Sequence, residues 1–254
     1  MLPAQPNQSL IDGLACLHTV IAAGAAVGSR EVGRRCRLER TRANRLLGTW
    51  RHLGLLDQTP TAKYVPGPGV HVLAGMGLRA SGLLQAALPI LERWWQRGWA
   101  TSLVVRWQDR ACFLVHSRPG QAFAEGIGSH ATAPAWRSSA GLVLLAEADD
   151  VDLERWACAE GWQAHGDGRT FAEVIAEVRS RGHATRTYAG DVRSIGMAVP
   201  GTQAAIAVSR ADLAGRALTA AVADLRTDAA AIAARVADDH AALVVVEDAD
   251  ALPA

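Results

Sequence analysis

Residues 29–54, which read SREVGRRCRLERTRANRLLGTWRHLG, decide the fold of the N-terminal part of this chain. Ser29 is a suitable N-cap for a short helix that continues to Cys36. Arg37 and Leu38 then form a tight connection into a further helix that starts near Arg40. Two helices joined by so short a turn are typical of the helix-turn-helix motif.

The helix that starts near Arg40 is amphipathic. We expect it to end at Gly54 and to present Arg42, Arg45 and Thr49 on its polar face. The opposite face is apolar and is expected to be buried: Ala43, Leu46, Leu47, Trp50 and Leu53.

An earlier helix precedes this pair, with Ser9 as its expected N-cap and Gly24 at its end. Its apolar stripe repeats with the period of a helix and is expected to be buried: Leu10, Leu14, Leu17 and Ile21, widened by Ile11 and Val20. Three short helices with a tight second connection predict a helix-turn-helix domain whose third helix lies in the DNA major groove.

The residues after Gly54 predict a small β-hairpin, the wing of a winged helix. Leu55-Leu56 and Tyr64-Val65 are two short extended pieces, and the polar turn DQTPTAK at residues 57–63 joins them. The alternative that these residues leave open is a three-helix cap with an ordinary hairpin that binds no DNA.

Basic residues gather around the predicted third helix. Residues 30–51 hold 8 arginines against Glu31 and Glu39, although the whole chain carries a net charge of only +1. Residues 65–254 are mildly acidic, with 17 basic against 21 acidic residues. A basic patch on such a body is the electrostatic footprint of a protein that binds a polyanion such as DNA. A solvated helical face is the alternative interpretation of these arginines.

The C-terminal part is expected to be an α+β domain in which an antiparallel sheet is flanked by helices. Glycine-rich but apolar residues 68–88 predict linker helices before it, and PILERWWQRG predicts a helix that follows Pro89. Four strands are expected in two hairpins: 101–107 with 111–117, and 194–200 with 204–209. Four further helices are expected beside them: 136–147, 151–159, 171–182 and 211–237.

Composition limits the class of protein. At 254 residues, half of them hydrophobic and 20% charged, the chain is long enough for one or two globular domains. The longest apolar run, residues 241–246, is far shorter than the roughly 20 residues of a membrane span. The N-terminus has no signal-peptide pattern, so we expect a cytoplasmic protein. The cysteines form no CxxC or CxxH pair, so we expect no metal, no cofactor and four buried thiols: Cys16, Cys36, Cys112 and Cys158.

The order of these segments resembles the IclR family of bacterial transcription regulators. The resemblance covers roughly residues 9–237 through these pieces: REVGRRCRLERTRANRLLGTWRHLGLL, YVPGPGVHVLAGMG, ALPILERW, HATAPAWRSSAGLVLLA, EVRSRGHAT and DVRSIGMAVP. It implies a winged helix-turn-helix domain at residues 1–66 and a linker helix that pairs subunits at residues 67–84. Residues 85–254 would then be a GAF/PAS-like domain whose small-molecule ligand changes operator affinity, in a dimer that can pair into a tetramer.

The resemblance also implies which residues contact DNA. The recognition helix would be LERTRANRLL at residues 38–47, helped by the start of the preceding helix and by the wing. The expected contacts are Ser29, Arg30, Arg40, Thr41, Arg42, Asn44, Arg45 and Lys63. Their chemistry agrees, because arginine can bind guanine with two hydrogen bonds, asparagine can bind adenine, and threonine can contact a phosphate or a thymine methyl.

For the effector pocket the resemblance implies the helix start Ser138-Ser139-Ala140-Gly141, with Ser194 and Ser209 from strands. Free amides at a helix N-terminus beside hydroxyl groups suit a small carboxylate, so a carboxylate or an aromatic acid is the expected effector. Arg186, where many relatives carry an acidic run, could also favour an anion. The alternative is that these serines only cap a helix and pack beside glycine.

Two other classes of function stay open. The C-terminal domain could be only an oligomerisation module, or the protein could be an enzyme, although the chain contains no HExxH, GxxxxGK[ST] or GxSxG motif. The chain is also rich in tryptophan, and these residues would either stack an aromatic effector or pack in the core or an interface: Trp94, Trp95, Trp99, Trp107 and Trp136.

Overall fold

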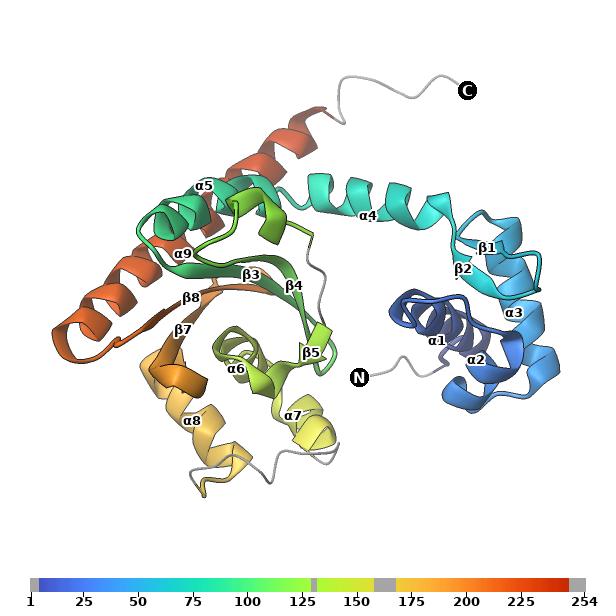
Figure 1. Cartoon of the computed structure of the whole chain (residues 1–254), viewed down its shortest axis with the longest axis horizontal. Helices are drawn as coiled ribbons and strands as arrows, with labels where there is room; N and C mark the ends of the chain where they lie inside the picture. Colours follow the sequence, from blue (N-terminus) through green and yellow to red (C-terminus); the bar gives the residue numbers. More distant parts are fainter. Residues whose placement is uncertain (1–4, 129–131, 158–167, 247–254) are drawn as a thin grey trace. The chain divides into compact units, whose positions relative to one another are not determined.

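The computed structural model describes residues 5–128, 132–157 and 168–246 (Figure 1). The chain forms two compact units, Met1–Ala80 and Ser81–Ala254. Among the described helices, none combines the length and the apolar character that a membrane crossing requires.

Three helices form the body of the first unit: α1 (Gln8–Ala22), α2 (Ser29–Cys36) and α3 (Arg40–His52). Arg37, in the turn between α2 and α3, has a left-handed backbone with φ of 56°. A Cβ atom on Gly33 would lie 2.9 Å from the carbonyl oxygen of Leu38, so only glycine permits this close approach of α2 to the turn. The predicted helix-turn-helix is confirmed.

The orientation of α1 differs from the sequence prediction. Its N-cap is Asn7, whose side chain accepts hydrogen bonds from the amides of Ser9 and Leu10. The predicted stripe is wrong, because four of its members are 39–66% exposed: Leu10, Ile11, Leu14 and Ile21. The buried face is Asp12, Gly13, Cys16, Leu17 and Val20. The reason is tertiary, since the Trp50 indole donates a hydrogen bond of 2.7 Å to the carbonyl oxygen of Gly13 and brings that face inward.

The wing is present as two antiparallel strands, β1 (Leu56–Gln58) and β2 (Tyr64–Pro66). Its inner residues Leu56 and Tyr64 pack on α1 and α3. Leu53 was expected in this core but is 60% exposed, because α3 ends one residue earlier. The wing leads into α4 (Pro68–Ala80), a helix with no buried residue.

The second unit is built on a six-stranded antiparallel sheet with the strand order β5-β4-β3-β8-β7-β6. Its strands are β3 (Ala100–Trp107), β4 (Arg110–Ser117), β5 (Thr132–Pro134), β6 (Ala184–Thr187), β7 (Val192–Val199) and β8 (Ala204–Ala211). Both predicted hairpins, β3-β4 and β7-β8, are confirmed. The two hairpins are joined into one sheet by the pairing of β3 with β8, in which Leu103 is opposite Ile206. The short strands β5 and β6 were not predicted.

Helices cover both faces of this sheet (Figure 1). One face carries α5 (Leu83–Gln96) and α9 (Gly215–Val246), packed on Leu103 and Ile206. The other carries α6 (Ser139–Ala146), α7 (Asp150–Ala157) and α8 (Phe171–Arg181), packed on Val104 and Ala205. Neighbouring residues of a strand point to opposite faces of the sheet. A strand that is apolar along its whole length therefore contributes side chains to the cores on both faces.

The sequence predicted a helix that begins after Pro89. Helix α5 instead begins six residues earlier, at Leu83, so Pro89 lies inside it. A buried stripe runs through the proline and offsets its missing amide: Ala86, Ala87, Ile90, Leu91 and Trp94. Asp228 of α9 accepts a 2.7 Å hydrogen bond from the Trp94 indole and pairs with Arg93. Trp94 also packs edge to face on Trp99, with ring centroids 5.0 Å apart, so these tryptophans belong to the core.

The expectation of four buried thiols holds only in part. Cys16 is buried, whereas Cys36 and Cys112 are partly exposed at the surface of their units. Cys158 lies outside the described residues.

Candidate functional site

The outer face of α3 carries polar side chains that point to solvent. Thr41, Asn44 and Arg45 are exposed, and their spacing of three and four residues puts them on one side of the helix. The Tyr64 hydroxyl donates a hydrogen bond of 3.4 Å to Oδ1 of Asn44, which links this face to the wing. A face with an arginine, an amide and a hydroxyl has the donors and acceptors that base edges require.

Arg42 lies on the side of α3 that faces α1. Its guanidinium is 2.7 Å from Oδ2 of Asp12, and the Gln8 side chain donates a 2.7 Å hydrogen bond to the other oxygen of that carboxylate. Asp12 is only 9% exposed, so the ion pair is a packing contact between two helices. The expected position of Arg42 beside Arg45 on one polar face is therefore wrong, because sequence periodicity did not reveal a buried aspartate in α1.

The other expected DNA contacts surround α3 within the first unit. Arg40 is exposed at the start of α3, Arg30 is exposed in α2, and Ser29 beside it is partly buried. Lys63 is exposed in the wing turn, where its amide donates a hydrogen bond of 3.2 Å to Oγ1 of Thr59.

Part of the predicted basic patch is neutralised by Glu31. Arg34 and Arg35 form ion pairs of 2.8 Å and 2.7 Å with its carboxylate. Their hydrogen bonds lower the pKa of Glu31 to about 2. The positive charge of Arg34 and Arg35 in α2 is thus partly balanced by the negative charge of Glu31.

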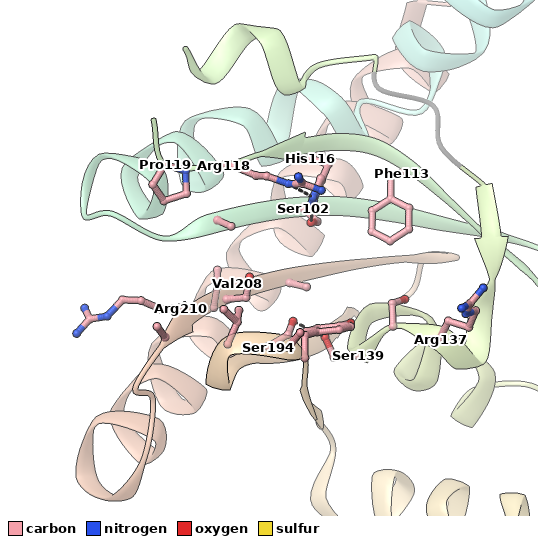
Figure 2. A pocket seen from close by; sticks show the side chains of 18 of the residues that line it. Ser102, Phe113, His116, Arg118, Pro119, Arg137, Ser139, Ser194, Val208 and Arg210 are labelled. Carbon is pink, nitrogen blue, oxygen red and sulfur yellow. Dashed lines mark hydrogen bonds between the residues drawn. The ribbon is translucent and has the colours of Figure 1, made fainter. Parts of the chain in front are cut away.

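The second unit contains an open cavity of about 1100 Å³ beside the sheet and the start of α6 (Figure 2). Four expected effector residues line it: Ser138, Ser139, Ser194 and Ser209. Ala140 and Gly141 do not line it, because Ala140 is 1% exposed and packs in the core under α6. Their predicted place in the pocket is wrong.

The start of α6 is held by its own serines and by a close backbone approach. The Ser138 hydroxyl accepts a 3.0 Å hydrogen bond from the Gly141 amide, as an N-cap does. The hydroxyls of Ser139 and Ser194 are 2.7 Å apart. A Cβ atom on Gly141 would lie 2.0 Å from the Ala135 carbonyl oxygen, so the helix start has no spare space. Ser138 therefore caps α6, as the alternative interpretation of these serines predicted, and it also lines the cavity.

A Ser102–His116–Arg118 group on the opposite wall was not predicted (Figure 2). Oγ of Ser102 lies 2.9 Å from Nδ1 of His116, and Nε of Arg118 donates a 3.0 Å hydrogen bond to Nε2 of His116. Ser102 and His116 are direct partners in the β3-β4 register only because a bulge between Leu103 and Val104 shifts the pairing by one residue, so the predicted hairpin turn alone could not pair them.

The hydrogen-bond directions in this group follow from the arginine, which can only donate. Nε2 of His116 must accept, so the proton of the neutral ring is on Nδ1 and is donated to Ser102. Burial, helped by the charge of Arg118, lowers the pKa of His116 and favours this neutral form. Within the part of the chain that the structure describes, the hydroxyl proton of Ser102 has no protein acceptor, so it can be donated to a ligand.

This arrangement does not fit serine nucleophile catalysis. A general base must present a lone pair to the serine hydroxyl, whereas Nδ1 of His116 presents a proton to Ser102. The third group of a catalytic triad is an acceptor, whereas Arg118 is a donor. The geometry suits the binding of a ligand.

The electrostatics of the cavity favour an anion. Arg118, Arg137 and Arg210 line it, and the described lining includes no aspartate or glutamate. Arg210 also stacks over the Trp99 ring, 5.2 Å from its centroid. Arg186 is not among the lining residues, because it donates a 2.8 Å hydrogen bond to the Trp136 carbonyl oxygen.

Solved structures share this architecture over nearly the whole chain. A putative IclR regulator from Silicibacter sp. is 18% identical with a TM-score of 0.75, over 90% of this chain and 96% of that chain. An IclR homologue from Microbacterium hydrocarbonoxydans, in complex with 4-hydroxybenzoate, is 22% identical with a TM-score of 0.66, over 91% and 99%. An IclR-family regulator from Brucella abortus is 16% identical with a TM-score of 0.69, over 94% and 95%.

The chain has the fold of IclR-family transcriptional regulators. The predicted fold class, a winged helix-turn-helix followed by a sheet-based α+β domain, is confirmed. No protein-family model and no curated protein sequence matches the chain.

Proposed function

We propose that this protein is an IclR-family transcriptional regulator that binds operator DNA and a small acidic effector. The exposed face of α3, with Thr41, Asn44 and Arg45 on a winged helix-turn-helix, is the observation that carries DNA binding. The IclR fold shared with solved regulators supports it. In this proposal residues 1–66 bind DNA, residues 67–84 form the linker and dimer contact, and residues 85–254 bind the effector and oligomerise.

Selection from a pool of random DNA duplexes tests this assignment. We expect the purified protein to enrich a near-palindromic sequence, because symmetric dimers bind two half-sites. Fluorescence anisotropy with the enriched duplex should then show an affinity that falls steeply as salt rises, since arginines and Lys63 displace counterions from phosphates. Failure to enrich any sequence would contradict the proposal.

The effector is proposed to be a small carboxylate, including aromatic acids. The cavity has three lining arginines and a free hydroxyl donor at Ser102, and a protein of the same fold binds 4-hydroxybenzoate. A bound ligand raises the unfolding temperature by mass action. We expect 4-hydroxybenzoate and related acids to raise it and matched alcohols, such as 4-hydroxybenzyl alcohol, to have no effect. If no acid binds, the alternative that the C-terminal domain is only an oligomerisation module describes the protein better.

Arg118→Ala is expected to weaken binding of such an acid by about tenfold or more, because a charge-assisted hydrogen bond is lost. Isothermal titration with the acid found in the screen measures this. The matched control is Arg216→Ala, which removes an exposed arginine of α9 that is not among the residues lining the cavity. Equal affinities of the two variants would exclude Arg118 from the effector site.

Homodimerisation is proposed through the outer surface of α4. Val72, Leu73 and Met76 lie on one side of this helix and are 58–63% exposed, which is unusual for large apolar side chains. Light scattering should therefore show at least a dimer. The double variant Leu73→Glu, Met76→Glu is expected to shift the protein to smaller species, whereas Ala74→Glu on the opposite side should not. Unchanged assembly of the double variant would place the contact elsewhere.

A further inference from the structure

Two cysteines meet where α1 crosses the end of α2. Cys16 is in the middle of α1, and Cys36 is the last residue of α2. Sγ of Cys36 lies 3.3 Å from Oγ1 of Thr19, which is three residues after Cys16 on α1. Cys16 belongs to the buried cluster against which Cys36 packs, and the neighbouring Cys36 thiol contributes to the raised pKa of Cys16. They are far apart in sequence but adjacent in the first unit.

The two thiols differ in access to solvent. Cys16 is 0% exposed, whereas Cys36 is partly exposed at the turn before α3. Burial, followed by the neighbouring Cys36 thiol and the charge of Asp12, raises the pKa of Cys16 to about 12. Cys16 is therefore protonated at neutral pH, and Cys36 is the sulfur that a soluble oxidant reaches first.

We propose that Cys16 and Cys36 form a modification site at which a hydroperoxide creates a disulfide between α1 and α2. The Cys36 sulfur attacks hydrogen peroxide, the O–O bond breaks, and Cys36 sulfenic acid and water result. The Cys16 sulfur then attacks the Cys36 sulfur, and the departing hydroxide takes the Cys16 proton to form a second water. Two electrons pass from the sulfurs to the peroxide, and two thiols become one disulfide.

The disulfide would act on α3 because the corner between α2 and α3 is tightly packed. A disulfide holds its sulfurs about 2.0 Å apart, closer than two sulfurs can approach without a bond, so the end of α2 must move towards α1. A Cβ atom on Gly33 would lie 2.9 Å from the Leu38 carbonyl oxygen and 3.5 Å from Cβ of Ala43. Movement of α2 therefore shifts the start of α3. We expect the oxidised protein to bind the operator about tenfold more weakly, and this consequence rests on the proposed DNA binding.

The cross-link is tested in the full chain with Cys112→Ser and Cys158→Ser, which leaves only the pair. After treatment with hydrogen peroxide, we expect both thiols to be lost to alkylation and dithiothreitol to restore them. Unreduced tryptic digestion should give a peptide that joins residues 1–30 to Cys36-Arg37. Retention of both thiols, or a disulfide found only between two chains, would overturn the proposal.

Single variants separate the two steps. With Cys16→Ala we expect Cys36 to stop at the sulfenic acid, which dimedone traps. With Cys36→Ser we expect Cys16 to remain a free thiol, because peroxide does not reach a buried sulfur. The proposed order, in which Cys36 is oxidised first, would be contradicted if Cys16 in the Cys36→Ser variant were oxidised as fast as it is in the protein that retains both cysteines.

The effect on DNA is measured with the duplex enriched from the random pool. Peroxide should weaken binding by the protein that retains the pair and leave the Cys36→Ser variant unaffected. Equal peroxide sensitivity of both proteins would overturn the link between the disulfide and α3. If the reduced protein binds no duplex at all, the proposed function fails, whereas the thiol and peptide measurements still decide the cross-link.

Discussion

Gly141→Ala is expected to lower the free energy of unfolding of the second unit by about 3 kcal/mol or more. The added Cβ would lie 2.0 Å from the carbonyl oxygen of Ala135 and 2.6 Å from its carbonyl carbon. Both atoms are backbone, so no flexible side chain can yield, and the start of α6 must lift from η2 (Ala135–Arg137). Urea unfolding followed by circular dichroism measures the loss.

The same substitution at an open glycine is the matched control. Gly75 lies within exposed α4, and a Cβ there would meet no atom within 4 Å. Gly75→Ala should therefore leave stability unchanged or raise it by up to about 1 kcal/mol, because alanine favours the helix. Similar unfolding curves for Gly141→Ala and Gly75→Ala would show that α6 does not approach η2 as described.

Arg45→Ala is expected to lower operator affinity by about 1–3 kcal/mol, or roughly 5- to 150-fold, without changing stability. Arg45 is exposed on the same side of α3 as Thr41 and Asn44, so under the proposed DNA binding its removal should take away a base contact and leave the core intact. Anisotropy titrations with the enriched duplex measure the affinity, and urea unfolding measures stability.

Arg42→Ala, three residues away, should show the opposite pattern. Its loss leaves the 9% exposed Asp12 carboxylate without its cationic partner, which should cost about 2 kcal/mol of stability. Operator affinity of the folded protein should stay close to that of the unmodified chain. If Arg42→Ala weakened binding as much as Arg45→Ala at unchanged stability, Arg42 would have to leave Asp12 and contact the operator.

The elements that the sequence predicted well are those whose local pattern agrees with their burial. The β3-β4 and β7-β8 hairpins combine apolar runs with clear turns, and α9 repeats buried Leu225, Ala229 and Ile232 at helical spacing. The strand β6 was missed because its four residues, ATRT, acquire their conformation by pairing with β7 at the sheet edge.

The candidate sites were predicted less completely than the fold. The resemblance identified the serines at the start of α6, whereas Ser102, His116 and Arg118 were missed. These three residues are unremarkable in the sequence, and only the pairing of β3 with β4 makes them one hydrogen-bonded group. Ala140 was wrongly placed in the pocket, because a helix-start motif does not reveal which of its residues face the core.

The sequence by itself determined a basic winged helix-turn-helix, its position before an α+β domain, and the apolar periods of the main helices and strands. These features depend on neighbours within a few residues, where helix and strand geometry is fixed by the backbone. Tertiary structure alone decided three contacts: the Trp50 indole turns Gly13 inward, Asp12 pairs with Arg42 and holds it away from the outer face of α3, and Cys36 packs against the cluster that contains Cys16. Each of these contacts joins two separate helices. Its free energy depends on how deeply the side chains are buried and how closely the helices approach, and a local sequence pattern contains neither.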